Sequence, residues 1–307
     1  MRVRRNVRLE KLFIDTLCES MTVHLMERLV RRIIANYDLH QRSGFPENIP
    51  IPQVNAAQQV YMDMMAENLL PRFIEVLIDV DTNGYMGRPV HVRLLPQVLD
   101  ALQELGLYYD ERYGAIVESE HKVKTGGWGV LREGFTYELS FLSFDIVGSS
   151  EIVRKHTHEE IVHAYTNVKR VAAGLIEKRE GRIWRWEGDG ALAAFYFGNR
   201  NFHVAMAGIE ILLELFMYNL FDCPLKEPIG VRLGAHTGPC SFNQNVDEIQ
   251  SATLNRLAEI DYRYTEPDSL TISPGVYSDL GTKLERFFRP HEVSSRNYLY
   301  RYKLRWE

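Results

Sequence analysis

The chain has 307 residues, 45% hydrophobic and 25% charged, which is the composition of a globular protein with a substantial core. Its net charge of −5 provides no overall basic field, so we expect no nucleic-acid partner. Three cysteines without a CxxC pair exclude a disulfide framework and fit a reducing compartment. Because no uninterrupted apolar run is long enough to span a bilayer and no signal-peptide core follows the basic N-terminus, we expect a cytoplasmic protein without a transmembrane segment.

The first part of the chain is predicted to be mostly helical. Leucines and other apolar residues recur at steps of three and four between charges, which is the pattern of amphipathic helices. Three closely spaced prolines at 43–52 cannot continue a helix. The predicted helices cover 8–36, 54–69, 71–79 and 96–105. Residues 1–135 carry no catalytic motif, and we expect them to form a regulatory or dimerisation region, or a cap packed on the rest of the chain.

A glycine-rich stretch at 124–129 marks the predicted boundary, and the pattern after it alternates between strands and helices. The predicted elements are, in order, a strand at 137–146, a helix at 157–179, a hairpin at 181–195, a helix at 202–220, a strand at 231–236, a helix at 250–260, and strands at 270–273 and 297–304. This order predicts that 136–307 form an α/β (α+β) domain of ferredoxin-like βαββαβ type.

Two aspartates follow the apolar strands of this domain. Asp145 ends a strand and precedes a glycine-containing turn, and Asp189 lies in the hairpin turn between two strands. An acid at the end of a core strand is costly to desolvate unless it is paired or binds a metal ion. Two such acids on neighbouring strands would offer oxygen ligands for Mg²⁺ or Mn²⁺. The alternative is that Asp145 caps the next turn and Asp189 only forms the hairpin.

Four segments in order carry a resemblance to a known family. They are FDIVGS at 144–149, the hairpin at 181–195, RLGAHTG at 232–238 and SATLNRL at 251–257. The two aspartates are separated by 189 − 145 = 44 residues, the separation that the family shows. Over about residues 136–304 the chain resembles the class III nucleotide cyclase catalytic domain, the family of adenylate and guanylate cyclases.

The resemblance implies an enzyme that converts a nucleoside triphosphate to its 3′,5′-cyclic monophosphate with loss of pyrophosphate. In that case Asp145, Asp189 and the backbone carbonyl of Ile146 would hold two divalent ions, Mg²⁺ or Mn²⁺. Arg256 would stabilise charge on the transferring phosphate. Because the family forms its sites between two catalytic domains, the resemblance also implies a homodimer with two sites at the interface.

The base-reading positions depart from those of purine cyclases. The hairpin carries Arg185 and Trp186 where purine cyclases place a lysine and a small residue. An arginine fork can address two acceptors on a base edge, and an aromatic ring narrows a pocket or provides a stacking face. The pair resembles the bacterial pyrimidine cyclases of the Pycsar antiphage systems, which make cyclic UMP or cyclic CMP to activate a separate effector. We therefore expect UTP or CTP as substrate, with strand alternation bringing only one of the two side chains to the base.

Further departures leave alternatives open. Ala252 stands where the family places an asparagine four residues before the arginine, and Asp247 is expected to replace the missing base-specifying acid near Asn245. Arg296 is expected to contact substrate near the C-terminal strand. The alternatives are an adenylate cyclase making cyclic AMP and a degenerate nucleotide-binding regulatory module. A diguanylate-cyclase or polymerase-palm relative is disfavoured, because the chain lacks the Gly-Gly-acid-acid-Phe turn and a basic groove.

Overall fold

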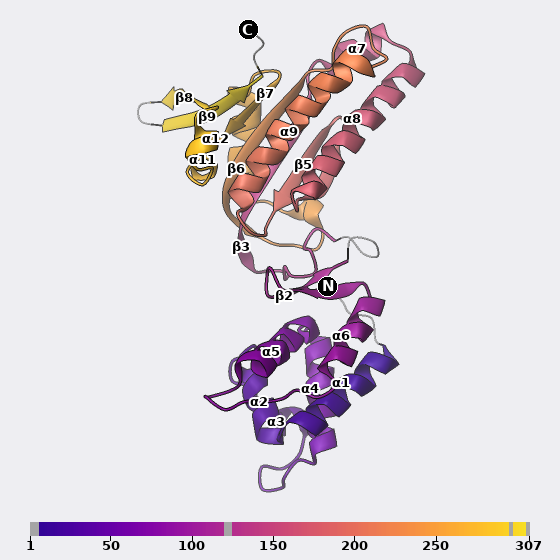
Figure 1. Cartoon of the computed structure of the whole chain (residues 1–307), viewed down its shortest axis with the longest axis vertical. Coiled ribbons are helices and arrows are strands. Elements are labelled where there is room, and N and C mark those ends of the chain that lie inside the picture. The colour runs from indigo at the N-terminus through magenta and orange to yellow at the C-terminus, as the bar shows by residue number, and fades with distance from the viewer. Residues whose placement is uncertain (1–5, 120–124, 295–296, 305–307) are drawn as a thin grey trace. The chain divides into compact units, whose positions relative to one another are not determined.

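The computed structural model describes residues 6–119, 125–294 and 297–304 (Figure 1). The chain divides into two compact units, Met1–Val130 and Leu131–Glu307. The division falls at Val130, whereas the sequence boundary was placed after residue 135.

The first unit is built mainly from helices, with one short antiparallel hairpin. Its elements are α1 (Val7–Ser20), α2 (Val23–Arg31), α3 (Leu39–Ser43), α4 (Gln53–Ala66), α5 (Leu70–Asn83), α6 (Leu95–Glu104), β1 (Leu107–Asp110) and β2 (Ala115–Glu118). The single helix predicted over 8–36 is wrong, because Met21 is extended and the Thr22 side chain caps a new helix by accepting from the backbone N–H of Leu25. The hairpin was missed because its four-residue strands are too short to show a clear alternation.

The core of the first unit is formed by the apolar stripes of α1, α4 and α5. Phe13 lies against Tyr61 and Phe73, with ring centroids 5.6 and 5.8 Å apart. A buried polar pair is satisfied internally, because the Tyr37 hydroxyl donates to Asp63 Oδ2 at 2.6 Å. Burial and this hydrogen bond raise the pKa of Tyr37, which keeps its hydroxyl protonated.

The second unit is a seven-stranded sheet with helices on its faces. Its strands are β3 (Thr136–Ile146), β4 (Arg182–Glu187), β5 (Gly190–Phe195), β6 (Val231–Ser241), β7 (Ser269–Ile272), β8 (Arg289–Ser294) and β9 (Asn297–Lys303). Its helices are α7 (Ser149–Lys155), α8 (His158–Lys178), α9 (Arg200–Phe221), the 3₁₀ turn η1 (Val246–Glu248), α10 (Ala252–Glu259), the π-helix η2 (Ile260–Tyr264), α11 (Pro274–Tyr277) and α12 (Thr282–Glu285).

The strand order is β4-β5-β3-β6-β7-β9-β8. The first four strands are antiparallel to one another, and with α8 and α9 they make a βαββαβ unit of ferredoxin-like order, whereas β6 and β7 pair in parallel. The predicted fold class is therefore confirmed. Strand β6 runs past the predicted end at 236, because it pairs with β3 along the whole length of that strand.

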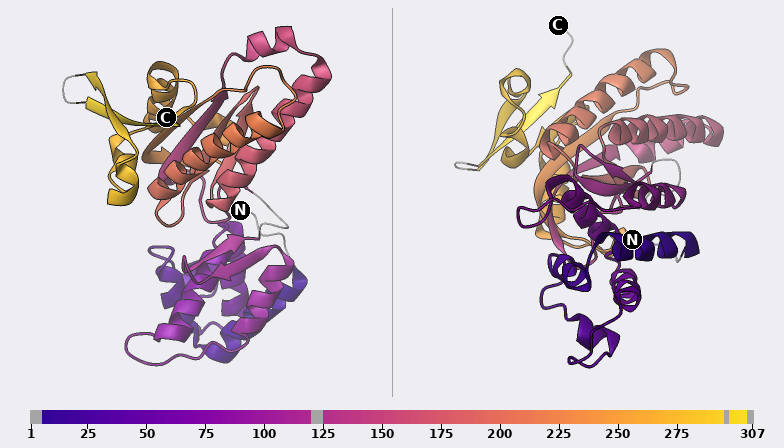
Figure 2. Two further views of the ribbon diagram at one scale, coloured as in Figure 1. Left: turned by 45° about the horizontal axis from the view of Figure 1, so that its top comes forward. Right: turned by 60° about the horizontal axis from the view of Figure 1, so that its bottom comes forward.

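The two faces of the sheet have different neighbours. Helices α8 and α9 lie side by side across one face, as the pink and orange helices in Figures 1 and 2 show. Leu142, Phe144 and Ile146 of β3 point into this helix-covered core. Because side chains alternate along a strand, Ser143 and Asp145 point to the opposite face, where α10 packs on β3 and β6.

Helix α9 is the one helix, among the described residues, that is long and apolar enough to cross a membrane by length and composition. Half of its most apolar window is buried inside the fold. Its Gly208 lies so close to the sheet that an added Cβ would come within 2.8 Å of Leu270 Cδ2. The buried side of α9 is thus explained by its packing on the sheet.

Candidate active site

The sheet face opposite α8 and α9, called the open face below, carries two of the predicted site residues, Asp145 and Arg185. They lie in two neighbouring rows of residues paired across the strands. In the row nearest the hairpin turn, Glu187 of β4 pairs with Gly190 of β5, and Asp145 of β3 pairs with Arg232 of β6. In the next row, Arg185 pairs with Leu192, Leu192 with Ser143, and Ser143 with Gly234. Paired residues share a face, so the sheet itself positions the charged groups side by side.

Asp145 lies in an ion pair that the sequence analysis did not predict. The Arg232 Nη2 group donates a hydrogen bond to Asp145 Oδ2, and both side chains are about three-quarters buried. This hydrogen bond raises the pKa of Arg232, so the guanidinium stays charged. The ion pair therefore holds the Asp145 carboxylate on the sheet face opposite α8 and α9.

Asp189 lies in the turn that joins β4 and β5 and is half-buried. The turn approaches Asp145 closely, because a Cβ added at Gly190 would lie 3.6 Å from Asp145 Oδ1. The charge of Asp189 also raises the pKa of Tyr165 on α8, after the larger effect of burial. The hairpin turn thus brings Gly190 close to the end of β3, and the metal role of Asp189 stays a prediction.

Ile146 is the third predicted metal ligand, through its backbone carbonyl. Its side chain is buried in the helix-covered core, and its backbone pairs with Val231 at the end of β3. The role of the carbonyl stays a prediction.

Arg185 and Trp186 lie on opposite faces of β4. Arg185 is on the same face as Asp145, with its Nε 2.6 Å from Glu187 Oε1. Trp186 instead lies over the helix-covered face, 6.5 Å from the Phe144 ring, with Lys169 Nζ 5.1 Å from its ring centroid. Of the two predicted base contacts, only Arg185 shares the face of Asp145.

Arg256 projects from α10 toward the same sheet face. It forms an ion pair with Glu259, and its charge reaches His236 of β6. Burial, and then Arg256, lower the pKa of His236 to about 4. His236 is therefore neutral at pH 7, and Arg256 lies near this half-buried neutral ring with its own side chain mostly shielded from solvent.

The low pKa of His236 makes stability depend on pH. The unfolded state takes up the proton near pH 6.5, whereas the folded state does so only near pH 4, so stability is complete above 6.5 and falls as pH falls toward 4. Urea unfolding of the wild type should lose roughly 2–3 kcal/mol from this group between pH 7.5 and 4.5. In His236→Asn this part of the loss should be absent, and an equal loss in both proteins would contradict the assignment.

Two predicted substrate contacts remain, Asp247 and Arg296. Asp247 is exposed in η1, which packs beside β4. Arg296 lies outside the described residues. Both roles stay predictions.

A carboxylate that the sequence analysis missed completes the site. Asp261 belongs to η2, directly after α10, and its Cβ would lie 3.4 Å from a Cβ added at Gly234. The pKa of Asp261 is raised to about 6, mainly by burial; Arg232 opposes the shift, Asp145 adds to it, and a hydrogen bond with Ser143 opposes it. An acid directly after the apolar Ile260, at the end of the helix predicted over 250–260, was the available sequence signal.

The charged rows surround a hollow of about 210 Å³. It is lined by Ser143, Phe144, Asp145, Arg185, Glu187, Gly190, Ala191, Leu192, Leu254, Leu257, Ala258 and Asp261. Four charged groups line this hollow: Asp145 of β3, Arg185 and Glu187 of β4, and Asp261 of η2.

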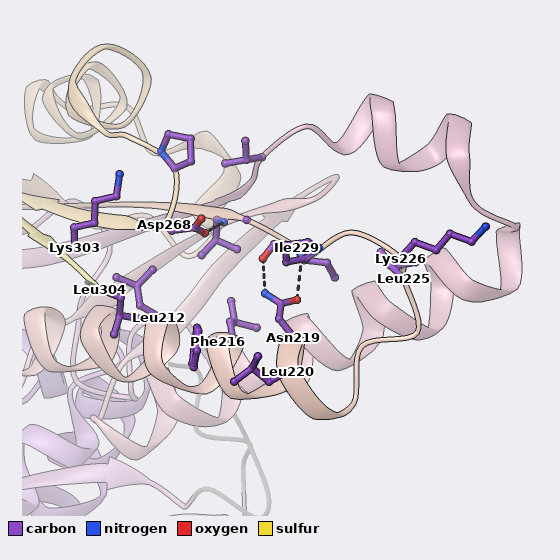
Figure 3. Close-up of a pocket in the computed structure, with 16 residues that line it drawn as sticks. Leu212, Phe216, Asn219, Leu220, Leu225, Lys226, Ile229, Asp268, Lys303 and Leu304 are labelled. Carbon is purple, nitrogen blue, oxygen red and sulfur yellow. Dashed lines mark hydrogen bonds between the residues drawn. The ribbon is translucent and has the colours of Figure 1, made fainter. Parts of the chain in front are cut away.

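A larger hollow of about 730 Å³ lies at the end of α9 and is lined mostly by apolar side chains (Figure 3). Its Asn219 amide is already used, because it donates to the carbonyl and accepts from the N–H of Ile229, at 2.9 Å each. The Lys226 ammonium points away from the hollow in Figure 3. The smaller hollow, with its charged lining, is therefore the candidate active site.

The donor set fits divalent cations of the Mg²⁺ type. Within residues 6–119, 125–294 and 297–304, no group of three or more His, Cys, Asp or Glu side chains is arranged as a metal site. Two carboxylates on adjacent strands, however, offer hard oxygen ligands of the kind that Mg²⁺ prefers, with substrate oxygens and water to complete the shell. Gly190 leaves space next to Asp145 Oδ1, because a Cβ at this position would lie 3.6 Å from that atom.

No protein-family model and no curated protein matches the sequence. Among solved structures, the guanylyl cyclase Cya2 is 18% identical over 55% of this chain and 92% of its own, with a TM-score of 0.46. The guanylate cyclase domain of RhGC from Catenaria anguillulae in complex with GTP is 13% identical over 54% and 96%, with a TM-score of 0.46. The adenylate/guanylate cyclase/hydrolase from Silicibacter pomeroyi is 18% identical over 56% and 99%, with a TM-score of 0.47.

All three are cyclase structures. With identities and TM-scores this low, the likeness carries no argument about the substrate, the metal ions or the partners of this chain.

Proposed function

We propose that this protein is a nucleotide cyclase that converts a nucleoside triphosphate to its 3′,5′-cyclic monophosphate and pyrophosphate. The observation that carries the proposal is the position of Asp145 at the end of β3, with the Asp189 turn beside it and Arg185 on the same face. The four ordered motifs of the sequence support the same function.

The reaction needs positioning and charge neutralisation more than covalent catalysis. The substrate 3′-oxygen attacks the α-phosphorus in line, and the bond from that phosphorus to the oxygen of the β-phosphate breaks. Asp145, Asp189 and the carbonyl of Ile146 would hold two divalent ions, which supply Lewis-acid charge at the attacking and leaving oxygens. Arg256, held near His236, would stabilise the charge that develops on the transferring phosphate.

Arg256 would come from the partner copy in a homodimer with two interfacial sites. Each chain carries Asp145, Asp189 and Arg256, so a two-fold arrangement of two chains would complete both sites with the same residues. Asp247 and Arg296 are further candidate substrate contacts in this arrangement.

A pyrimidine triphosphate, UTP or CTP, is the proposed substrate. Arg185 presents a forked donor to the hollow, and the hollow of about 210 Å³ in one chain is small. The product would act in the cytoplasm as a second messenger of bacterial antiphage defence, on a separate effector.

The test of the function is incubation of the full chain with each of the four ribonucleoside triphosphates and Mn²⁺, with products separated by chromatography. Cyclic UMP or cyclic CMP supports the proposal, whereas cyclic AMP alone supports the adenylate cyclase alternative. A degenerate nucleotide-binding module is the second candidate, because Ala252 replaces the asparagine of the family. A thermal shift with triphosphate but no product with Mn²⁺ or Mg²⁺ would select that candidate.

Arg185→Ala should change the base preference more than it changes metal binding. A charge-assisted hydrogen bond contributes about 1.5–3 kcal/mol, so the preference for the favoured pyrimidine over ATP, as a ratio of kcat/KM, should fall by about tenfold or more. Arg182→Ala is the matched control on the same strand, since Arg182 does not line the hollow. An unchanged preference in Arg185→Ala would remove the residue from base recognition.

A further inference from the structure

Arg232 faces two carboxylates, of which it hydrogen-bonds one. Its Nη2 group donates to Asp145, while its buried Nε has no hydrogen-bond partner among the described residues. Asp261 is close enough for its charge to act on Arg232. Arg232 therefore has a buried Nε–H group that donates to no partner in the described part of the chain, and a second acid, Asp261, lies near it.

The Asp261 carboxylate interacts with Ser143 through a side-chain hydrogen bond, but one of its two oxygens has no partner among the described residues. Its Oδ1 atom is buried and, within the part of the chain that the structure describes, accepts no hydrogen bond. Its carboxylate is fixed in place because η2 lies directly over Gly234, whose row is adjacent to that of Arg232 and Asp145 on the same sheet face. A buried unpaired acceptor is costly, so its retention calls for a partner in another state of the site.

Binding of a divalent ion to Asp145 would create a state in which Arg232 can pair with Asp261. Such an ion would compete with the guanidinium for the carboxylate and would repel its positive charge. Removing Arg232 from Asp145 without another acid would leave a charge in a site that is largely shielded from water, which is strongly unfavourable. Asp261 is placed to accept the guanidinium when this happens.

We infer that Asp261 is a positioning residue that takes over Arg232 when Asp145 binds a divalent cation. The inference rests on the metal role of Asp145 in the proposed function. It assigns Asp261 no direct bond to the ion, and it makes the exchange of Arg232 between two carboxylates part of cation binding. The five-residue π-helix η2 is then the device that brings the second carboxylate to the sheet.

The test measures Mn²⁺ binding to the full chain without nucleotide. Electron paramagnetic resonance of the free ion reports how much Mn²⁺ is bound. In Asp261→Asn, Arg232 keeps Asp145 as its only charged partner, so Mn²⁺ affinity should fall by about tenfold to a hundredfold, the usual range for residues that support a metal ligand. Asp268→Asn is the control, since Asp268 accepts from Val231 N–H at 3.2 Å and lines the other hollow. The control should bind Mn²⁺ like the wild type.

A double variant separates positioning from direct coordination. Adding Arg232→Gln to Asp261→Asn removes the competing guanidinium, so Mn²⁺ affinity should recover to near that of the wild type. Wild-type affinity in Asp261→Asn alone, or no recovery in the double variant, would overturn the inference.

Different results would refute the proposed cyclase function and the proposed exchange of Arg232. A wild-type chain that binds Mn²⁺ through Asp145 and responds to Asp261→Asn, but cyclises no triphosphate, would refute the cyclase and leave the exchange standing. Mn²⁺ binding that is unaffected by Asp145→Asn would overturn both.

Discussion

Asp145→Asn is expected to reduce turnover by on the order of 10³-fold or more, because the amide cannot hold divalent ions against a triphosphate. Product formation from the favoured triphosphate at saturating Mn²⁺ measures this loss, and Mn²⁺ binding should weaken in parallel. The fold should be retained, since Arg232 keeps Asp261 as a nearby acid after Asp145 loses its charge. Unfolding curves and circular dichroism of the variant check that the fold is intact.

Asp268→Asn is the control for removing a carboxylate from the same unit. Asp268 has a positive φ of 55°, which asparagine tolerates, so the substitution should leave both stability and turnover near those of the wild type. A fully active Asp145→Asn chain would refute the metal assignment and with it the two-metal mechanism.

Arg256→Ala is expected to lower kcat by about 10²- to 10³-fold with a smaller change in KM, because a positioned donor of this kind acts mainly on the transition state. Steady-state kinetics with the favoured triphosphate measure the separation of the two parameters. Arg263→Ala is the matched control, since Arg263 also pairs with Glu259, at 3.4 Å, but is exposed. Equal losses in both variants would mean that the ion pairs of Glu259, rather than catalysis, explain the effect.

Mixing the two inactive chains tests where Arg256 acts. If Arg256 serves the aspartates of the partner copy, a heterodimer of Asp145→Asn and Arg256→Ala has one intact site out of two. With random assembly of equal amounts, half of the dimers are mixed, so about a quarter of the wild-type activity should return. No recovery on mixing, with dimers present, would place the site within a single chain.

Local patterns in the sequence were sufficient for the strands and long helices of the second unit. The apolar residues Leu142, Phe144 and Ile146 alternate with Ser143 and Asp145, and this alternation by itself predicts a strand with one buried face. The same rule separated Arg185 from Trp186. In the first unit the periodicity continued across Met21 and Thr22, so it could not reveal that a side-chain cap begins a new helix there.

The sequence by itself determined the order of the elements, the two aspartates at strand ends and the opposite faces of Arg185 and Trp186, because each follows from residues that are neighbours along the chain. Only the tertiary structure decided that Arg232 pairs with Asp145 and that Asp261 lies over Gly234. Those contacts depend on the register of β3 against β6 and on the return of the chain through α10 and η2. Register and chain reversal are set by the packing of the whole sheet, which no local pattern of residues encodes.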